Sequence, residues 1–217
     1  MMTPHFDSGM PAGHVTKGRI IHWAGTYDAL FGWFLRRTHD TVVNLAAPNP
    51  GEEVLDVGCG TGSLALRLEA SLGARGSVHG IDASPEMIDT ARHKALKAGI
   101  DVDFRVGFAE ELPFADRTFD LVVSQLVIHH LPGDLKSRAF GEMCRVLKHN
   151  GRCVIVDFEP PKTMLWRSLA RLLHRHVMMQ TDVRHYGAMM EDMGFSEIEV
   201  GRTRHRMLAF VRGRVAA

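Results

Sequence analysis

Residues 53–62 have the sequence EVLDVGCGTG, and this stretch decides the fold of the chain. Its first half is an apolar run typical of a buried strand, and the glycines at 58, 60 and 62 predict a sharp turn behind it. Apolar residues then recur at helical spacing over Ser63–Leu72. A strand that passes through a glycine turn into a helix places backbone N–H groups and a positive helix end at the carboxyl edge of a sheet. We therefore expect a polar ligand at this turn.

Strands and helices alternate after this turn, which is typical of a sheet covered by helices on both faces. We expect helices at 63–72, 85–98, about 135–147, and 185–193. The expected strands are 53–57, 77–81, 102–106, 119–124, 152–158, 196–200 and 205–211. The sequence thus predicts an α/β fold with a doubly wound, mostly parallel seven-stranded sheet. We expect the last two strands to form an antiparallel edge and an N-terminal helical cover to precede the sheet.

Two further regions flank or interrupt this pattern. Aromatic and aliphatic residues recur at helical spacing over 20–45, and the segment 48–51 (PNPG) then punctuates the chain. We assign 1–47 to an N-terminal tail and helical cover, and 48–217 to the main domain with a helical insertion at about 161–190. The insertion is rich in leucine and methionine, which form either an adaptable apolar pocket or plain core.

The glycine spacing also separates two classes of cofactor. A dinucleotide fingerprint is G-x-G-x-x-G, whereas here the last position of that pattern is Ser63 and the glycines alternate behind Asp56. A carboxylate at the strand end disfavours a pyrophosphate and favours a ligand with ammonium and sulfonium charges. This indicates S-adenosylmethionine. Asp82, at the end of the next strand, could accept hydrogen bonds from the ribose hydroxyls of either cofactor.

The overall charge gives no general reason to expect nucleic acid as a partner, because 26 Lys and Arg nearly balance 25 Asp and Glu. Residues 161–217 are richer in arginine than the rest of the chain. This excess fits a solvated basic face, and a patch for an anionic ligand is the alternative.

The cysteines and histidines of the chain bear on its cellular location and on whether it binds a metal. The three cysteines have no paired spacing, which favours free thiols and a cytoplasmic protein. Residues 1–13 lack the features of a signal peptide, and no apolar run reaches the ~18 residues that a membrane span needs. The 13 histidines show no ligand spacing, so we expect no metal site.

Five stretches together carry a resemblance to a known family: VLDVGCGTG at 54–62, HGIDASPEM at 79–87, GFAEELPF at 107–114, TFDLVVSQLVIHHL at 118–131 and EMCRVLKHNG at 142–151. In this order they resemble the class I S-adenosylmethionine-dependent methyltransferases, in the group that includes the ubiquinone/menaquinone biosynthesis C-methyltransferases. The resemblance implies a Rossmann-like methyltransferase fold and S-adenosylmethionine as the cofactor. For the substrate it is weak, because this group methylates carbon, nitrogen, oxygen and metalloid centres.

The resemblance implies roles for the residues of the glycine turn. Gly58, Gly60 and Gly62 would let the main chain pass close to the methionine and ribose portions of the cofactor. Asp56 would lie near its ammonium group, and Asp82 would bind the ribose hydroxyls.

The adenine side follows in the same way. Ala83 and Met87 would lie against the ring, although Met87 could equally be core. The family commonly has a short polar residue where this chain has Phe108, so the adenine would stack on Phe108 instead. Ala109 N–H and Glu110 would lie nearby, with plain packing and loop charge as the alternatives for Phe108 and Glu110.

At the methionine end, Ser124 and Gln125 would line the site, and Tyr27 of the N-terminal cover could close over it or be an ordinary helix contact. His129 and His130 follow the fourth strand of the sheet, where the methyl group should project. One of them is the candidate general base, because imidazole accepts protons near neutral pH. The alternative is that a histidine only fixes the loop by packing or hydrogen bonding.

We therefore expect methyl transfer to a small and hydrophobic acceptor, with the apolar insertion forming part of its pocket. A non-catalytic S-adenosylmethionine-binding module and a methyltransferase acting on a macromolecule are the alternatives. A nicotinamide-dependent oxidoreductase is disfavoured by Ser63 and Asp56. The sequence leaves the oligomeric state open.

Overall fold

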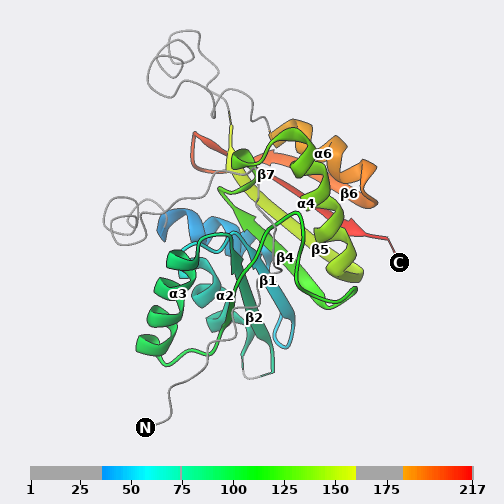
Figure 1. Ribbon diagram of the computed structural model, residues 1–217. Coiled ribbons are helices and arrows are strands. Elements are labelled where there is room, and N and C mark those ends of the chain that lie inside the picture. Colours follow the sequence, from blue (N-terminus) through cyan, green and yellow to red (C-terminus); the bar gives the residue numbers. More distant parts are fainter. Residues whose placement is uncertain (1–35, 74, 160–182, 217) are drawn as a thin grey trace.

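The computed structural model describes residues 36–73, 75–159 and 183–216, which form a seven-stranded sheet of order β3-β2-β1-β4-β5-β7-β6 (Figure 1). The five neighbouring strands β3, β2, β1, β4 and β5 are parallel to one another, and β7 is antiparallel to both β5 and β6. The strands are β1 (Glu53–Val57), β2 (Ser77–Asp82), β3 (Asp103–Val106), β4 (Phe119–Gln125), β5 (Leu147–Phe158), β6 (Phe195–Arg202) and β7 (Leu208–Val215). The prediction of a doubly wound, mostly parallel sheet with an antiparallel edge is confirmed.

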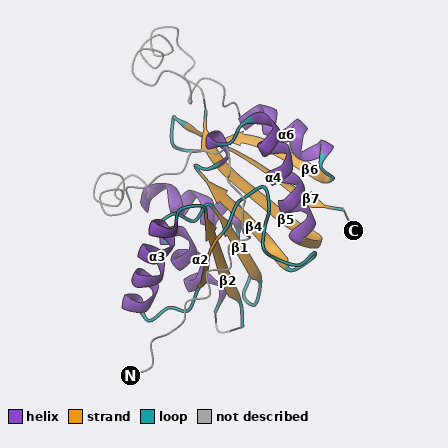
Figure 2. Cartoon of the chain, viewed as in Figure 1, coloured by secondary structure: helices purple, strands orange, loops and turns teal. Residues whose placement is uncertain are grey.

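Helices cover both faces of the sheet (Figure 2). One face carries α2 (Ser63–Leu72), α3 (Pro85–Ala98) and the helical residues 36–46, and the other carries α4 (Gly133–Val146) and α6 (Val183–Asp192). A short 3₁₀ helix, η1 (Ile128–His130), follows β4. Each face has its own buried apolar cluster, so the sheet is covered on both sides as its continuous apolar strands require.

The ends of α3 show how local sequence sets an element. The Ser84 hydroxyl accepts a hydrogen bond from the N–H of Met87, and Pro85 occupies the first turn. Gly99 ends the helix in a left-handed conformation with φ of 65°. Both ends agree with the predicted helix at 85–98, and α3 thereby starts directly behind Asp82.

Two predicted boundaries were wrong. The strand expected at 152–158 begins at Leu147, because Leu147 already pairs with Phe119 and the polar Asn150-Gly151 step lies inside β5 rather than in a turn. Asn150 adopts a left-handed φ of 60°, which accommodates the irregular register there. The last strand begins at Leu208 rather than 205, because residues 203–208 form a hydrogen-bonded turn between β6 and β7.

Part of the predicted cover and insertion can be placed. Residues 36–46 are helical, as expected for the end of the cover, and α6 agrees with the helix predicted at 185–193. Tyr27, the rest of the cover and residues 160–182 of the insertion lie outside the described residues. The division at residues 47 and 48 stays a prediction. None of the helices in the described part of the chain is long and apolar enough to cross a membrane.

Three arginines of the C-terminal region have acidic partners in the structure. Arg202 pairs with Glu159, Arg212 with Glu199, and Arg214 lies within ion-pair distance of Glu197. These arginines fit a solvated face better than a patch for an anionic ligand.

Candidate functional site

The three glycines of the turn all adopt left-handed backbone conformations. The φ angle is 75° at Gly58, 52° at Gly60 and 78° at Gly62, a region that other residues rarely occupy. A side chain at Gly58 would collide with Val127, and one at Gly62 would collide with Phe104. At Gly60, no atom of the described residues lies within 4 Å of where a Cβ would stand. The turn is therefore packed against protein on both flanks and open at its centre.

Hydrogen bonds from neighbouring elements fix the turn. The N–H of Cys59 donates to the carbonyl of Ile81 in β2 at 2.8 Å. The Lys94 ammonium, from α3, donates to the hydroxyls of Thr61 at 2.8 Å and Ser63 at 3.0 Å. The turn is thus held between β2 and α3, so its shape is set by the fold itself.

Asp56, in β1 directly before the turn, is a buried carboxylate without a hydrogen bond. It is 1% exposed, and neither of its oxygens has a hydrogen-bond partner among the described residues. Burial, reinforced by the charge of Asp82 and partly offset by the nearby N–H of Ala65, raises the pKa of Asp56 to about 8. A buried polar group without a partner costs roughly 1–3 kcal/mol, and a charged group costs more. A cationic group at the turn would satisfy this carboxylate, so Asp56 fits the ammonium of S-adenosylmethionine.

Asp82, at the end of β2, faces the same turn. One oxygen accepts from the N–H of Gly60 and the other from the N–H of Ser84, both at 2.9 Å. Burial raises the pKa of Asp82, and these two hydrogen bonds lower it in part. Each carboxylate oxygen can accept a second hydrogen bond, so Asp82 can receive two donors from a ligand while it still holds the turn.

A second turn, after β3, lies beside Asp82. The N–H of Gly107 donates to the Asp82 carbonyl at 3.1 Å, and Phe108 forms a bridge with Glu111. Ala109 and Glu110 are 9% and 5% exposed. Glu110 is therefore no loop charge in solvent.

The remaining residues predicted for the adenine side lie at the start of α3. Met87 is 3% exposed, and Ala83 is half-buried next to Asp82. Ala83 and Met87 thus follow Asp82 along the chain, and the hydrogen bond of Gly107 places the turn with Phe108, Ala109 and Glu110 beside Asp82.

The end of β4 contributes two of the predicted residues with different surroundings. Ser124 is fully buried and donates to the Val57 carbonyl at 2.9 Å, so its hydroxyl ties β4 to β1. Gln125 donates from Nε2 to the Thr38 hydroxyl at 2.5 Å, while its buried Oε1 has no partner among the described residues. Leu126 follows with φ of 58°, a strained conformation that turns the chain toward η1.

His129 and His130 lie in η1, and the structure separates their surroundings. His129 is 9% exposed and donates from Nδ1 to Asp157 Oδ1 at 2.7 Å, while its backbone N–H donates to Asp157 Oδ2 at 2.9 Å. The His130 ring packs on that of His129 with 3.9 Å between centroids. Val127, two residues before His129, contacts Gly58, so η1 lies directly beside the glycine turn.

Asp157 was missed by the sequence analysis. It is fully buried at the end of β5, one strand away from β4. The available signal was a lone acid at the end of the apolar run CVIVD, at the edge of the sheet where ligands bind. The contact between His129 and Asp157 joins residues that are far apart in the sequence, so no local sequence pattern could predict it.

The methionines of the predicted insertion are core where they are described. Met190 is 0% exposed, and Met189 packs against the same apolar cluster. The expectation that these two line an acceptor pocket is therefore not supported, because α6 uses them to dock on α4 and the sheet.

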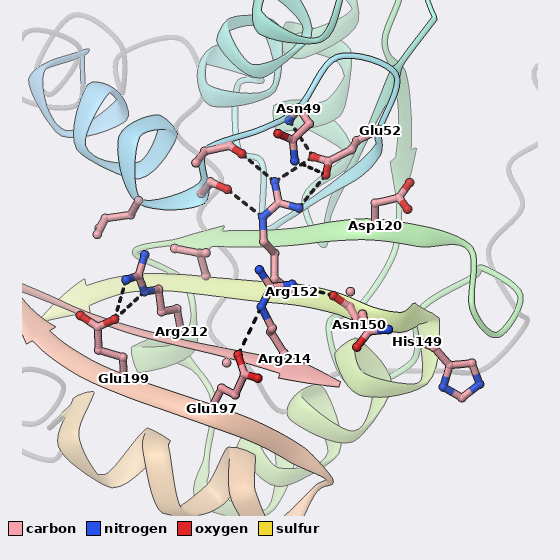
Figure 3. A pocket seen from close by; sticks show the side chains of 16 residues that line it. Asn49, Glu52, Asp120, His149, Asn150, Arg152, Glu197, Glu199, Arg212 and Arg214 are labelled. Atoms are coloured by element: carbon pink, nitrogen blue, oxygen red, sulfur yellow. Dashed lines mark hydrogen bonds and ion pairs between the residues drawn. The ribbon is translucent and has the colours of Figure 1, made fainter. Parts of the chain in front are cut away.

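The opposite, amino edge of the sheet holds a cavity of about 650 Å³ (Figure 3). Its centre is Arg152, which binds the Glu52 carboxylate through two nitrogens at 2.7 and 2.8 Å and donates to the carbonyls of Ala46 and Ala47. Arg212 pairs with Glu199 on the same wall. Its arginines thus already have acidic partners, and we do not place the cofactor there.

Among the residues that the structure describes, no group of three or more His, Cys, Asp or Glu side chains is placed to hold a metal ion.

Known proteins are similar to this chain in both sequence and fold. Residues 54–151 match the family model described as "Methyltransferase domain". Aklanonic acid methyltransferase DauC of Streptomyces sp. (strain C5) is 36% identical over 133 residues, which are 59% of this chain and 58% of that protein. The ubiquinone/menaquinone biosynthesis C-methyltransferase UbiE of Geotalea daltonii is 34% identical over 122 residues, covering 55% and 51%. The chain thus spans about half the length of these curated relatives.

Solved structures support the same fold. A SAM-dependent methyltransferase from Aquifex aeolicus superposes with a TM-score of 0.68 at 21% identity, covering 88% of this chain and 94% of that one. The Haloferax volcanii complex of the Trm112 methyltransferase activator with a putative methyltransferase gives a TM-score of 0.73 at 21% identity, covering 90% and 95%. Residues 54–151 are thus similar in sequence to a methyltransferase domain, and the strand order and the solved structures show the Rossmann-like fold of S-adenosylmethionine-dependent methyltransferases.

Proposed function

We propose that this protein transfers a methyl group from S-adenosylmethionine to a small, hydrophobic acceptor and that His129 removes the acceptor's proton. The observation that carries the proposal is the glycine turn, which is open at Gly60 and backed by the unsatisfied carboxylate of Asp56. A pyrophosphate would add negative charge beside that carboxylate, whereas a methyl donor with an ammonium group would neutralise it.

The residues around the turn have distinct roles in this proposal. Asp56 faces the ammonium group, and Asp82 receives the ribose hydroxyls on its two free acceptor positions. The main chain at Gly58, Gly60 and Gly62 gives the cofactor room to approach.

The adenine ring lies among the side chains that surround Asp82. Phe108 stacks on it, and the N–H of Ala109 and the buried Glu110 face its polar edge. Ala83 and Met87 line the other side.

His129 is the proposed general base. When bound, the cofactor supplies a methyl group on a sulfonium, and its transfer is an in-line displacement that needs an acceptor atom with a free lone pair. The Asp157 carboxylate accepts a hydrogen bond from the Nδ1–H of His129. Nε2 is then the ring nitrogen that can take a proton. An acceptor that must lose a proton on methylation, such as a phenol or a carbon acid, would use this group.

A hydrophobic acceptor is supported by the surroundings of His129. Ile128 is buried, Leu131 packs against the apolar core, and the Phe158 ring meets the His129 ring edge-on at 4.9 Å. Two relatives are named for methylation of aklanonic acid and demethylmenaquinone, and a third is named for arsenite. The apolar residues beside the base favour organic acceptors over a small inorganic one.

Calorimetry on the purified protein tests the cofactor. We expect S-adenosylmethionine and S-adenosylhomocysteine to bind and NAD not to bind. Asp82→Ala should weaken binding by about 1–3 kcal/mol through the loss of charge-assisted hydrogen bonds. Glu111→Ala is the control, because Glu111 is exposed in the turn beside Asp82. Unchanged affinity in Asp82→Ala, or tight binding of NAD, would contradict this part of the proposal.

A panel of acceptors graded in polarity tests the reaction. Mass spectrometry should detect methylated product for apolar phenols or carbon acids, and transfer should be slower for small charged acceptors and for arsenite. Preference for charged acceptors would overturn the proposal that the acceptor is hydrophobic. Cofactor binding without transfer to any small molecule, protein or nucleic acid would instead identify a non-catalytic binding module.

The free state of Cys59, Cys144 and Cys153 fits our further proposal of a cytoplasmic location.

A further inference from the structure

A buried tyrosine of α6 binds Asp157, and a buried lysine of α4 lies beside that tyrosine. Tyr186 of α6 is 2% exposed and donates from its hydroxyl to Asp157 Oδ2 at 3.3 Å. Lys136 of α4 is 9% exposed, and its ammonium lies 5.5 Å from the centre of the Tyr186 ring. Neither residue belongs to the glycine turn or to the proposed cofactor contacts. The Tyr186 ring packs in the apolar core against Phe140, whereas its hydroxyl is directed to Asp157.

The hydrogen bonds of Asp157 are complete. Oδ1 accepts from His129 Nδ1 and from the N–H of Phe158 at 2.8 Å, and Oδ2 accepts from the His129 N–H and the Tyr186 hydroxyl. Four donors on one carboxylate fix its orientation at full burial. Two of these donors belong to His129 and one to the neighbouring Phe158, so Tyr186 supplies the one donor that comes from α6.

Lys136 supplies the matching charge. The Lys136 ammonium lies over the ring of Tyr186, whose hydroxyl binds Asp157. Burial lowers the pKa of Lys136, and the charge of Asp157 offsets this in part. A buried lysine is costly unless a counter-charge lies nearby, and the Asp157 carboxylate provides one. The groups facing His129 and Asp157 in the described residues are therefore His130 from η1, Lys136 from α4 and Tyr186 from α6.

We infer that Tyr186 and Lys136 are positioning residues, which hold the Asp157 carboxylate in place and thereby hold His129 in the tautomer with its proton on Nδ1. The importance of this for catalysis rests on the proposed function, because it is the unprotonated Nε2 that takes the acceptor's proton. The tautomer itself is a property of the protein alone. It can therefore be measured without knowledge of the acceptor.

Nitrogen-15 NMR of the histidine side chains tests the inference on the intact chain without cofactor. At pH about 9, where imidazoles are neutral, the His129 ring should show a protonated Nδ1 and an unprotonated Nε2, with His129→Gln used to assign its signals. Tyr186→Phe removes only the hydroxyl, and Lys136→Met removes only the charge at similar length. Both should produce a mixture of the two tautomers and faster exchange of the Nδ1 proton with water.

Met190→Leu is the matched control. Met190 is fully buried on the same helix, four residues after Tyr186, and this swap conserves volume. It should leave the His129 signals and the turnover unchanged. An equal change in this variant would show that disturbed packing, rather than the lost hydroxyl or charge, explains the effect, and would overturn the inference.

Turnover with an identified acceptor gives the second readout. We expect kcat to fall about 3- to 10-fold in Tyr186→Phe and in Lys136→Met with KM unchanged, in line with the loss of one hydrogen bond to a charged group. An unchanged tautomer in both variants, a proton on Nε2 in the wild type, or an altered tautomer with unchanged kcat would each overturn the inference. The predicted tautomer changes in a protein that methylates no acceptor would refute the proposed function and leave the positioning role standing.

Discussion

The two edges of the central sheet treat charge in opposite ways. At the amino edge, the Arg152 guanidinium is matched by the Glu52 carboxylate and by carbonyls from the end of the helical segment 36–46. At the carboxyl edge, Asp56 is more deeply buried and has no hydrogen bond among the described residues. Charges that are matched within the chain stabilise the fold. A buried carboxyl that no described residue satisfies marks the place where we propose that a cationic group binds.

The pKa values of two acids express the same contrast. Burial alone would raise the pKa of Glu52, but hydrogen bonds from Arg152 and Asn49 lower it to about 2. Burial raises that of Asp56 to about 8. Glu52 therefore adds stability above its unfolded pKa that is lost as the pH falls toward 2, whereas Asp56 costs stability as the pH rises toward 8. The following changes would break or sharpen this comparison.

The largest effect is expected from His129→Gln at the carboxyl edge. Loss of the general base should lower kcat by about 10²- to 10⁴-fold with an acceptor that must lose a proton. Cofactor affinity, measured by calorimetry, should stay within a factor of about two. A parallel loss of affinity would assign His129 to the cofactor pocket instead.

Arg152→Met at the amino edge should act on stability and spare function. Removing one partner of a largely buried ion pair should lower the free energy of unfolding by about 2–4 kcal/mol near neutral pH, since Glu52 is left uncompensated. Denaturation by urea measures this loss, which should shrink as the pH approaches 3 and Glu52 becomes protonated in the unfolded chain. Cofactor affinity of the folded variant should not change.

Asp56→Asn should give the reverse pattern. The variant without cofactor should be about 1–3 kcal/mol more stable than the wild type at pH about 8.5, because a buried charge has been removed. The difference should shrink as the pH falls from about 8 toward about 4, where the carboxyl is protonated in the unfolded chain as well. Calorimetry should show weaker S-adenosylmethionine binding, by about tenfold. Higher stability with undiminished affinity would mean that Asp56 does not face the ligand.

The smallest effect is expected from Arg212→Gln. Its pair with Glu199 is exposed, with 43% and 53% of the two side chains accessible. Such pairs contribute about 0–1 kcal/mol, and salt screens them. Urea denaturation should therefore barely separate this variant from the wild type, in contrast to Arg152→Met in the same cavity.

Much of the fold could be predicted because its signals are local. The start and end of α3 follow from Ser84, Pro85 and Gly99, and all three residues act within a few positions of themselves. The start of β5 was misplaced for the opposite reason. Pairing with Phe119 of β4 extends the strand to Leu147, and a distant partner leaves no trace in local spacing.

The residues of the candidate site fall into the same two groups, those that local sequence predicts and those that depend on distant contacts. The glycine turn and Asp82 could be located because parallel strands bring their ends to one edge of the sheet. The hydrogen bond from Ser124 to Val57, and the approach of Asp157 and Tyr186 to His129, depend on packing between elements far apart in the chain. Only the folded structure shows that Ser124 is occupied as a tie between strands and that His129 has an acidic partner.

The unsatisfied carboxylate of Asp56 also bears on how long a molecule of this protein persists in a cell. If the methyl donor neutralises it, the donor acts as a folding ligand, and the population of opened chains falls as the donor concentration rises above its dissociation constant. Proteases act mainly on opened chains. The amount of this protein would then follow the supply of the proposed methyl donor.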